Sequence, residues 1–536
     1  MINSIKNVFV LIKEYINNIV YKKKFIIPFV LSVFVSYFYS ISNGIVFVDD
    51  PAHELYYGSD SIKLRTLRWA QVLINRIFGT IQYTTSMYKL FGIIFLVLSA
   101  FLFGTLLYFF DSNKEKDNKY IVLSCIYISY PLIQEFWEYD DALAIPFGLT
   151  LVLFCLIYQV INKTDFKDYL LLGSILSLVM AGYESPIFAY ISLVFLILFI
   201  EYALNKTKDK GWFIEGLKYA LPLVIAFVLK YVIGYAVLAI SGLSRIDSYG
   251  ETTIYWLSDA SKAVTQLIFN GFYYGLRGLS YLPIGEFVVC ALLFLIFIIV
   301  NTKKNKKYLG LGLLYLISLF FMPIMMGAHF PYRTAQTIHL FVAFVVYLIY
   351  GCFEDKKIKK LSLKPVLIVI VGVLCIRQCV FMHHYLSLDK LRSDNEFYVA
   401  KSIGYKLVNE FDISKPIIFC GHYDMGDYIE DQIYVDADSL GGKIENSLRK
   451  SFGYDGEEYN IPFIETNVNS VFNWAINSPW QLAIKNYLSY YGYDIEVNED
   501  LTIEETREYE KMAKSLNMKA YDIKEFDDYI LVYLGD

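Results

Sequence analysis

Long apolar runs separated by short charged connections constrain this chain more than any other feature. Since about 20 apolar residues carry a helix across the hydrocarbon core of a membrane, the sequence predicts about eleven membrane-spanning helices. They cover roughly residues 25–42, 88–110, 120–133, 142–161, 168–182, 186–204, 217–240, 286–301, 308–328, 337–352 and 364–384. The predicted fold class is therefore an α-helical polytopic membrane protein.

The overall composition supports this class. Of the 536 residues, 56% are hydrophobic, 18% are aromatic and 19% are charged. That profile excludes an ordinary soluble globule and a disordered chain. The first apolar run, Phe25 to Ile41, follows no signal-peptide pattern of short apolar core and small-residue cleavage site, so we expect it to be a retained membrane helix.

Charge divides the chain into two parts. Residues from Asp389 onward hold 29 of the 53 acidic residues but only 14 of the 48 basic ones. We therefore expect a basic, mostly apolar membrane domain over residues 1–388 and an acidic, water-soluble domain over residues 389–536. Strand patterns at 415–421 and 529–534, with a capping box from Thr502 to Glu505 that opens a helix, predict that the second domain is a small α/β unit.

Lysine marks every second connection between the predicted spans, starting with the N-terminal segment. Short lysine-rich connections stay in the cytoplasm, because translocating them is unfavourable and the inner leaflet is anionic. The pattern therefore predicts a cytoplasmic N-terminus and an extracytoplasmic C-terminal domain. The connections concerned contain Lys22–Lys24, Lys114–Lys119, Lys163–Lys167, Lys206–Lys210, Lys303–Lys307 and Lys356–Lys360.

The other connections are poor in lysine, and the same topology places them together on the outer face. Ionisable residues at or within a membrane are functional candidates, because they are costly to place there. The candidates in these connections are Asp49 and Asp50, then Glu135, Asp140 and Asp141, then Tyr183 and Glu184, and finally His329 and Arg333.

The first outer connection also contains an amphipathic pattern. From Leu64 to Gly79, apolar residues such as Leu67 and Ile74 fall on one side of a predicted helix and polar residues on the other. Such a helix would lie in the membrane interface and hold Arg65 and Arg68 at the depth of lipid phosphates. The plainer interpretation is that both arginines only extend toward lipid head groups.

Acids and arginines gathered at one membrane face suit glycosyl transfer from a polyprenyl-phosphate sugar. One carboxylate, Asp49 or Asp50, would act as the base on the acceptor hydroxyl. Cationic side chains would stabilise the charge on the departing phosphate. For that role we consider Arg65, Arg68, His329 and Arg333. The side chains expected to bind sugar hydroxyls are Glu135, Asp140, Asp141, Tyr183 and Glu184.

Other interpretations of these residues stay open. Asp49 and Asp50 could lie in a solvated loop or cap a helix, and beside a phosphate they could also hold Mg²⁺ or Mn²⁺. No other cofactor is predicted. Cys375, Cys379 and His383 share one face of a predicted helix, where packing within the membrane is favoured over a metal site.

In their order along the chain, these motifs resemble the Gtr-type glucosyltransferases that decorate bacterial O-antigens and related surface polymers, which belong to the GT-C superfamily. The resemblance covers about residues 25–350. In the family pattern we would expect glycine where this chain has Leu67, and glutamine where it has Glu184. The segments that carry the resemblance are Asp49–Asp50, Arg68–Trp69, Asp141–Phe147, Gly182–Ser185 and His329–Arg333.

The resemblance implies a GT-C-like fold in the bacterial cytoplasmic membrane, with an extracytoplasmic active site. It implies undecaprenyl-phosphate-glucose as the donor and a surface polysaccharide or lipid-linked glycan as the acceptor. The acidic motif at Asp49 and Asp50 would be catalytic. Membrane lipid is the other expected partner, and no nucleic acid is expected.

Two other functions remain possible from the sequence. A surface-glycan polymerase or ligase would also use arginines in outer connections, but it would join preassembled lipid-linked repeats. A flippase or transporter of lipid-linked sugars would place charged residues and broken helices at mid-membrane. The gathering of ionisable residues at the outer face disfavours the transporter.

Overall fold

A computed structural model of the chain is mostly helical. It describes residues 2–42, 58–78, 85–111, 114, 117–131, 133, 143–204, 211–246, 254–258, 260–261, 263–264, 267, 282–303, 305–327, 334–358, 361–426, 470–477, 481–499 and 501–535. Seven of the candidate site residues lie outside these ranges.

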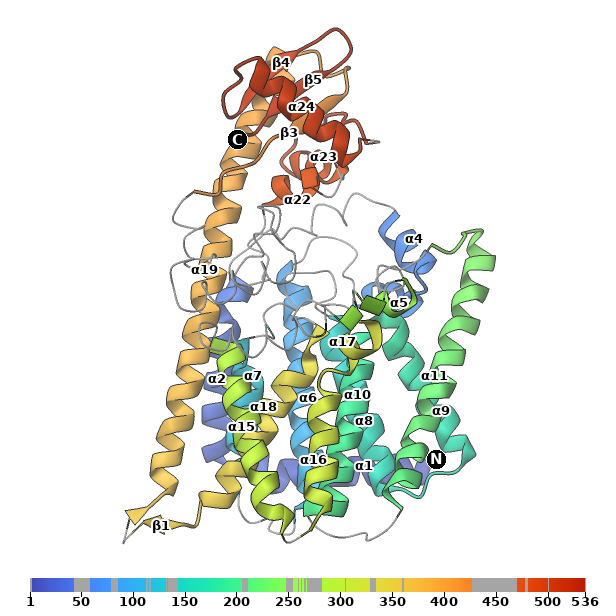
Figure 1. Ribbon diagram of the computed structural model, residues 1–536, viewed down its shortest axis with the longest axis vertical. Coiled ribbons are helices and arrows are strands. Elements are labelled where there is room, and N and C mark those ends of the chain that lie inside the picture. Colours follow the sequence, from blue (N-terminus) through green and yellow to red (C-terminus); the bar gives the residue numbers. More distant parts are fainter. Residues whose placement is uncertain are drawn as a thin grey trace.

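Helices that stand side by side form the body of the molecule (Figure 1). Each apolar run predicted to span the membrane overlaps at least one of them. Short π-helical turns extend α1 and α10. The helices are α1 (Ile2–Tyr15), α2 (Lys23–Ser42), α4 (Gly58–Arg65), α5 (Trp69–Ile77), α6 (Thr85–Phe110), α7 (Asn118–Ser129), α8 (Ala144–Ile161), α9 (Phe166–Gly182), α10 (Ser185–Phe199), α11 (Trp212–Ser241), α13 (Tyr255–Ser258), α15 (Leu282–Thr302), α16 (Lys307–Ser318), α17 (Phe321–Met326), α18 (Gln336–Phe353), α19 (Lys364–Glu410), α22 (Val471–Asn477), α23 (Gln481–Tyr490) and α24 (Ile503–Ser515).

The number of spans is confirmed only in part. At 1.5 Å per residue, a helix of 12 residues such as α7 or α16 is about 18 Å long, which is shorter than a hydrocarbon core of about 30 Å. Within the described residues, seven helical segments are long and apolar enough to cross a membrane: Lys89–Phe110, Ala144–Ile161, Ser185–Leu204, Trp212–Ser241, Gly285–Thr302, Gln336–Phe353 and Lys364–Glu410. Helices α2 and α9 are not among them. This architecture is that of an integral membrane protein.

The helix ends that border the lysine-rich connections lie at one end of the helical body, the lower end in Figure 1. Lys22 and Lys24 both contact the carboxylate of Asp117, at 2.7 and 2.6 Å. Lys364, at the start of α19, lies 3.5 Å from Glu354, directly after α18. Segments that the lysine pattern assigns to the same membrane face are therefore in contact.

An N-terminal helix that the sequence did not predict lies at this same end. Helix α1 packs against α6 and α8, and Asn7 donates a 3.0 Å hydrogen bond to Asn162. Val8, Leu11 and Tyr15 recur at helical spacing and are buried. The helix crosses the ends of the neighbouring helices in Figure 1, as an amphipathic interfacial helix does.

Helix ends that lead into the lysine-poor connections meet at the opposite end. Tyr37 of α2 donates a 2.6 Å hydrogen bond to the carbonyl of Ile128 in α7. Ser129 donates one of 2.6 Å to Gln378 of α19, and Gln378 donates one of 2.6 Å to Glu286 of α15. The described flanks of the first, second and fourth outer connections are thereby held together.

The C-terminal part contains a small three-stranded sheet, in agreement with the sequence. Strand β3 (Ile417–Cys420) pairs in parallel with β5 (Ile530–Tyr533), and β5 pairs in antiparallel fashion with β4 (Asp522–Glu525). Thr502 and Glu505 form the predicted capping box at the start of α24.

Helix α19 joins the two parts of the molecule without a break. It follows a short antiparallel pair, β1 (Lys357–Ile358) with β2 (Leu361–Ser362), and continues for 47 residues. The predicted boundary after residue 388 falls inside this helix, and the division into two domains stays a prediction. Just beyond it, Arg392 is fully buried, with its guanidinium 2.6 Å from the carboxylates of Asp389 and Glu396.

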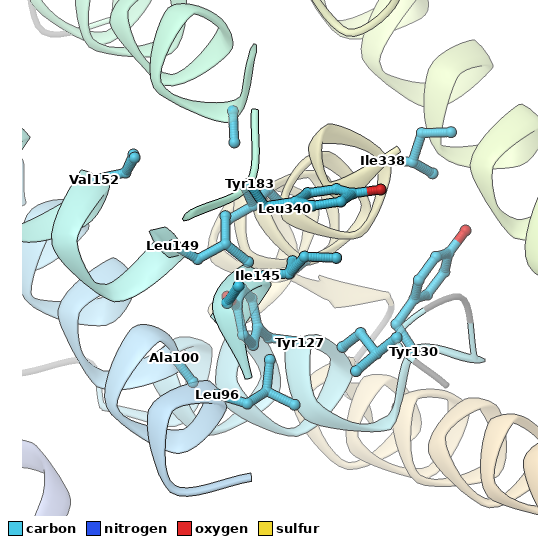
Figure 2. Close-up of a cluster of buried hydrophobic side chains, with 14 of the residues drawn as sticks. Leu96, Ala100, Tyr127, Tyr130, Ile145, Leu149, Val152, Tyr183, Ile338 and Leu340 are labelled. Atoms are coloured by element: carbon cyan, nitrogen blue, oxygen red, sulfur yellow. The ribbon is translucent and has the colours of Figure 1, made fainter. Parts of the chain in front are cut away.

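A continuous apolar core runs through the helical body and reaches the helix ends on the lysine-poor side. Figure 2 shows a part of it, where Leu96 of α6, Leu149 of α8 and Leu340 of α18 come together. Tyr130 and Tyr183, which directly follow α7 and α9, belong to the same cluster. The core therefore supports the turns that carry candidate site residues.

Candidate functional site

Two short helices precede α6, instead of the single helix predicted over Leu64–Gly79. Helix α4 ends at Arg65 and α5 begins at Trp69, and α5 keeps the amphipathic pattern. The guanidinium of Arg76 in α5 lies 2.8 Å from the carboxylate of Asp60 in α4. This contact links the two helices across the turn.

Leu67 forms the turn in a left-handed backbone conformation, with a φ of 62°. The Arg68 N–H binds the Lys63 carbonyl at 2.7 Å, and the Leu67 N–H binds the Leu64 carbonyl at 2.9 Å. This is a Schellman turn, whose left-handed position usually holds glycine. The Leu67 side chain is 2% exposed. A Cβ on Gly234 of α11 would lie 3.0 Å from Leu67 Cδ2, so the glycine makes room for the leucine.

The turn directs Arg68 at the connection between α9 and α10. Its Nη2 lies 3.2 Å from Oε2 of Glu184, and its guanidinium carbon lies 5.0 Å from the centre of the Tyr183 ring. A cation over an aromatic face is attracted by the ring quadrupole. The structure thus brings together one residue predicted to bind phosphate and two predicted to bind substrate.

Glu184 also contacts a lysine that is absent from the sequence-based candidates. Lys230 Nζ lies 2.9 Å from Glu184 Oε1, and the Lys230 side chain is only 9% exposed. This residue lies in the middle of α11, among apolar neighbours. A lone lysine in such a run is costly and marks a functional candidate, and this signal could have identified it. Arg68, Glu184 and Lys230 are called the polar cluster below.

Glu184 is ionised within the polar cluster. Burial opposes ionisation, but the positive charges of Arg68 and Lys230, with the hydrogen bond from Lys230, outweigh burial and lower the pKa of Glu184 to about 2. Near neutral pH this carboxylate therefore orients two cations and does not donate a proton.

Further contacts hold the segments that supply the polar cluster. Trp69 Nε1 donates a 3.3 Å hydrogen bond to the Lys230 carbonyl, which ties α5 to α11. Gln336 donates a hydrogen bond to the hydroxyl of Ser185, the first residue of α10. Since Gln336 follows Arg333 by three positions, the described end of that outer connection lies beside the turn that carries Glu184.

Arg65 is directed elsewhere. Its Nε donates a 3.0 Å hydrogen bond to the carbonyl of Ser244, and its own carbonyl accepts one of 3.2 Å from the Ile246 N–H. Arg65 therefore holds the segment after α11 against α4. Its predicted role in phosphate binding has no support from these contacts.

The remaining predicted site residues lie outside the described residues, and their roles stay predictions. Described helix ends nevertheless border them: α2 ends at Ser42, seven positions before Asp49, and α8 begins at Ala144, shortly after the second acidic group. The residues concerned are Asp49, Asp50, Glu135, Asp140, Asp141, His329 and Arg333.

The polar cluster does not suit a metal ion. Its one carboxylate already contacts two cations, and a metal there would be repelled by both. Within the described ranges, no group of three or more His, Cys, Asp or Glu side chains could hold a metal. The idea of Mg²⁺ or Mn²⁺ at Asp49 and Asp50 concerns residues outside those ranges.

The arrangement suits an anion at the end of the helical body. Arg68 has a planar guanidinium that matches phosphate oxygens, and Lys230 adds a compact charge. Together they exceed the charge of Glu184 by one. The N-terminus of α10, which begins at Ser185, adds the positive end of a helix dipole.

Comparison with known proteins agrees with these features. A family model described as Glucosyl transferase GtrII matches residues 38–350, which is more than half of the 536-residue chain. The matched segment contains the polar cluster and all the predicted site residues, and it confirms the resemblance noted from the motifs. No curated protein matches the chain. The chain therefore belongs to the glucosyl transferase GtrII family and is a membrane glucosyltransferase.

Proposed function

We propose that this glucosyltransferase takes glucose from a polyprenyl phosphate and transfers it to a cell-surface glycan, at the outer face of the bacterial cytoplasmic membrane. Family membership supports the sugar and the reaction class. The choice of a polyprenyl-phosphate donor is supported by the polar cluster. There the two cations Arg68 and Lys230 outnumber the single carboxylate of Glu184, at the end of apolar helices. A phosphate attached to a membrane lipid fits this charge and this place.

In the proposed reaction, the acceptor hydroxyl attacks the anomeric carbon of glucose as the bond from that carbon to the phosphate oxygen breaks. Asp49 or Asp50 takes the proton from the hydroxyl. The polyprenyl phosphate leaves with the electron pair, and Arg68 and Lys230 stabilise its charge. Glu184 keeps both cations oriented between turnovers. A single displacement of this kind inverts the anomeric configuration.

The outer location is proposed from the lysine pattern. The lysine-rich segments contact one another at one end of the helices, as between Lys22 and Asp117. The polar cluster lies at the opposite end, with α4 and α5 (Figure 1). If the lysine-rich end is cytoplasmic, as the positive-inside rule predicts, the polar cluster faces outward. The predicted roles of His329 and Arg333 in phosphate binding, and of Glu135, Asp140, Asp141 and Tyr183 in sugar binding, belong to the same proposal.

The test is transfer by the purified protein. Polyprenyl-phosphate-glucose labelled in the sugar is supplied with membranes that contain surface glycan, and glucose release and transfer are measured. Asp49→Asn and Asp50→Asn are tested separately and together. Asp60→Asn is the control, since Asp60 also lies in this region but pairs with Arg76 at 2.8 Å. Wild-type transfer by the double variant would exclude the catalytic assignment, and failure of the wild type to use this donor would exclude the proposed donor.

A further inference from the structure

A pocket of about 320 Å³ lies at the lysine-rich end of the helices, between the end of α8 and the first turns of α9 and α11. The polar cluster lies at the opposite end of the helical body (Figure 1), so this pocket is a separate site. Its volume is within the range of small-molecule binding sites. The lining consists of residues 159–164, Tyr169 of α9, and Glu215, Lys218 and Tyr219 of α11.

Buried hydrogen bonds fix the floor of the pocket. The hydroxyl of Tyr190 in α10 lies 2.7 Å from Gln159 Oε1 and 2.9 Å from the carbonyl of Tyr219. Tyr190 is fully buried, and Tyr219 is 4% exposed. A single tyrosine therefore joins α8, α10 and α11 beneath the pocket, and the helical body itself holds the pocket walls in place.

The groups that face the pocket are mainly hydrogen-bond donors and cations. Thr164 donates a 2.9 Å hydrogen bond to the hydroxyl of Tyr169, which leaves the O–H proton of Tyr169 available to a ligand. Lys163 has no ion-pair partner among the described residues. Lys218 lies 3.1 Å from Glu215, one turn earlier on α11. Two lysines and one glutamate give the lining a net charge of +1.

The acidic residues that follow α8 do not reduce this charge at the pocket. Asp165 caps α9 and accepts a 3.0 Å hydrogen bond from the Asp168 N–H. Asp168 accepts one of 3.1 Å from the Asp165 N–H and another from the hydroxyl of Tyr158. Neither aspartate belongs to the lining, where Glu215 is the one acid among the described residues. The pocket therefore suits an anion with several acceptor oxygens, such as a phosphate group.

Exposed apolar side chains next to the lining indicate that the anion belongs to a membrane lipid. Leu170 follows Tyr169 on α9 and is 42% exposed, and Leu217 precedes Lys218 on α11 and is 54% exposed. Trp212, at the start of α11, is of the type that anchors helices at the membrane interface. In a membrane protein, exposed apolar residues on such helices contact lipid tails. The pocket thus lies where the head group of a lipid would be expected.

We propose that this pocket binds the phosphate-containing head group of an anionic phospholipid. The ammonium groups of Lys163 and Lys218 contact the phosphate oxygens, and Tyr169 donates a hydrogen bond to one of them. If the lysine-rich end is cytoplasmic, the lipid comes from the inner leaflet, which is the anionic one. The bound lipid would link α9 to α11, the helices that lead to Glu184 and contain Lys230. The proposal does not depend on the donor or the acceptor of the transfer reaction.

The test measures lipid binding to the purified full-length protein in a neutral detergent. Phosphatidylglycerol is titrated, and the dissociation constant is obtained by native mass spectrometry and by the shift in thermal unfolding. Phosphatidylcholine is the control lipid, and glycerol 3-phosphate and inorganic phosphate supply the anion without tails. The variants are Tyr169→Phe and the double variant Lys163→Gln with Lys218→Gln. Lys167→Gln is the matched control, because Lys167 lies in the same connection, is exposed and does not line the pocket.

We expect the double variant to raise the dissociation constant for phosphatidylglycerol about tenfold, a change of about 1.4 kcal/mol in binding free energy. Tyr169→Phe should raise it roughly fivefold, the usual effect of one hydrogen bond, and Lys167→Gln should leave it unchanged. Equal losses in Lys167→Gln and in the double variant would show general attraction to positive charge and overturn the site. Binding of glycerol 3-phosphate or inorganic phosphate as tight as that of the lipid would overturn the lipid as the ligand. Equal binding of phosphatidylcholine would exclude selection for an anionic head group.

Discussion

The ammonium group of Lys230 lies 2.9 Å from the carboxylate of Glu184, although Lys230 is surrounded along its helix by apolar residues. Arg68 approaches the same carboxylate at 3.2 Å. The family pattern led us to expect glutamine at this position. A neutral amide would not hold two cations as strongly, so the charge balance of this site depends on Glu184.

The pairing of Glu184 with Lys230 predicts strong coupling between the two residues. Glu184→Gln leaves a buried ammonium with a weaker partner, and Lys230→Met removes one of the two cations that contact the carboxylate. A double-mutant cycle on thermal unfolding of the purified protein should give a coupling free energy of about 1 kcal/mol or more. If the effects of the two single substitutions on the free energy of unfolding simply add, the contact between Glu184 and Lys230 contributes nothing to stability.

Arg68 is predicted to contribute directly to transfer. Arg68→Ala should lower kcat/KM about 10²- to 10³-fold, the usual cost of removing one group that stabilises developing charge. Arg68→Lys should restore only part of the loss, because lysine lacks the planar fork and the stacking on Tyr183. Arg76→Ala is the control: it removes a surface ion pair worth about 1 kcal/mol or less and should retain activity. If Arg76→Ala and Arg68→Ala lower kcat/KM equally, Arg68 does not contribute directly to transfer.

The left-handed backbone conformation of Leu67 predicts an unusual order of stability among variants at this position. Leu67→Ala should lower the free energy of unfolding by about 2–5 kcal/mol, because the side chain is buried. Leu67→Gly loses the same side chain but avoids the left-handed strain, worth about 1–2 kcal/mol. The glycine variant should therefore be more stable than the alanine variant by about 1 kcal/mol, measured by chemical or thermal unfolding. The reverse order would show that the turn is not left-handed.

The low pKa of Glu184 predicts how its charge responds to pH. Its pKa in the folded protein is about 2, compared with an ordinary value of 4.5. Ionised Glu184 therefore stabilises the folded state above about pH 4.5, and this contribution is lost as the pH falls through about 2. We expect the transfer rates of the wild type and of Glu184→Gln to fall at the same midpoint pH across the acid range, because Glu184 stays ionised until the pH reaches about 2. If the midpoint pH differs in Glu184→Gln, protonation of Glu184 causes the loss of activity in acid, and this prediction is wrong.

Local and periodic features of this protein could be predicted from its sequence. Lysine spacing grouped the connections that the structure brings into contact, as between Lys22 and Asp117. Apolar runs located the helices, and the capping box at Thr502 located the start of α24. Arg68, Tyr183 and Glu184 were correctly placed at the same end of the helices. Each of these features depends on neighbouring residues or on a simple repeat.

Features that depend on contacts between distant helices could not be predicted in the same way. The glycine expected from the family pattern is consistent with a left-handed turn at Leu67, but nothing next to Leu67 shows how a leucine fits there, because its side chain depends on the room left by Gly234 in α11. Arg65 and Arg68 are only three positions apart, but Arg65 contacts Ser244, beyond the end of α11, whereas Arg68 contacts Glu184. Lys230 was visible as a lone charge, but its partner is set by the packing of α11 beside α9.

The continuity of α19 has a mechanical consequence. At 1.5 Å per residue its 47 residues form a rod about 70 Å long, which contacts Ser36 of α2 through Cys379 and then enters the C-terminal part at the buried Arg392. No loop within this rod can absorb a displacement. If the C-terminal part moves and α19 moves with it as one body, the contact of Cys379 with Ser36 of α2 moves as well.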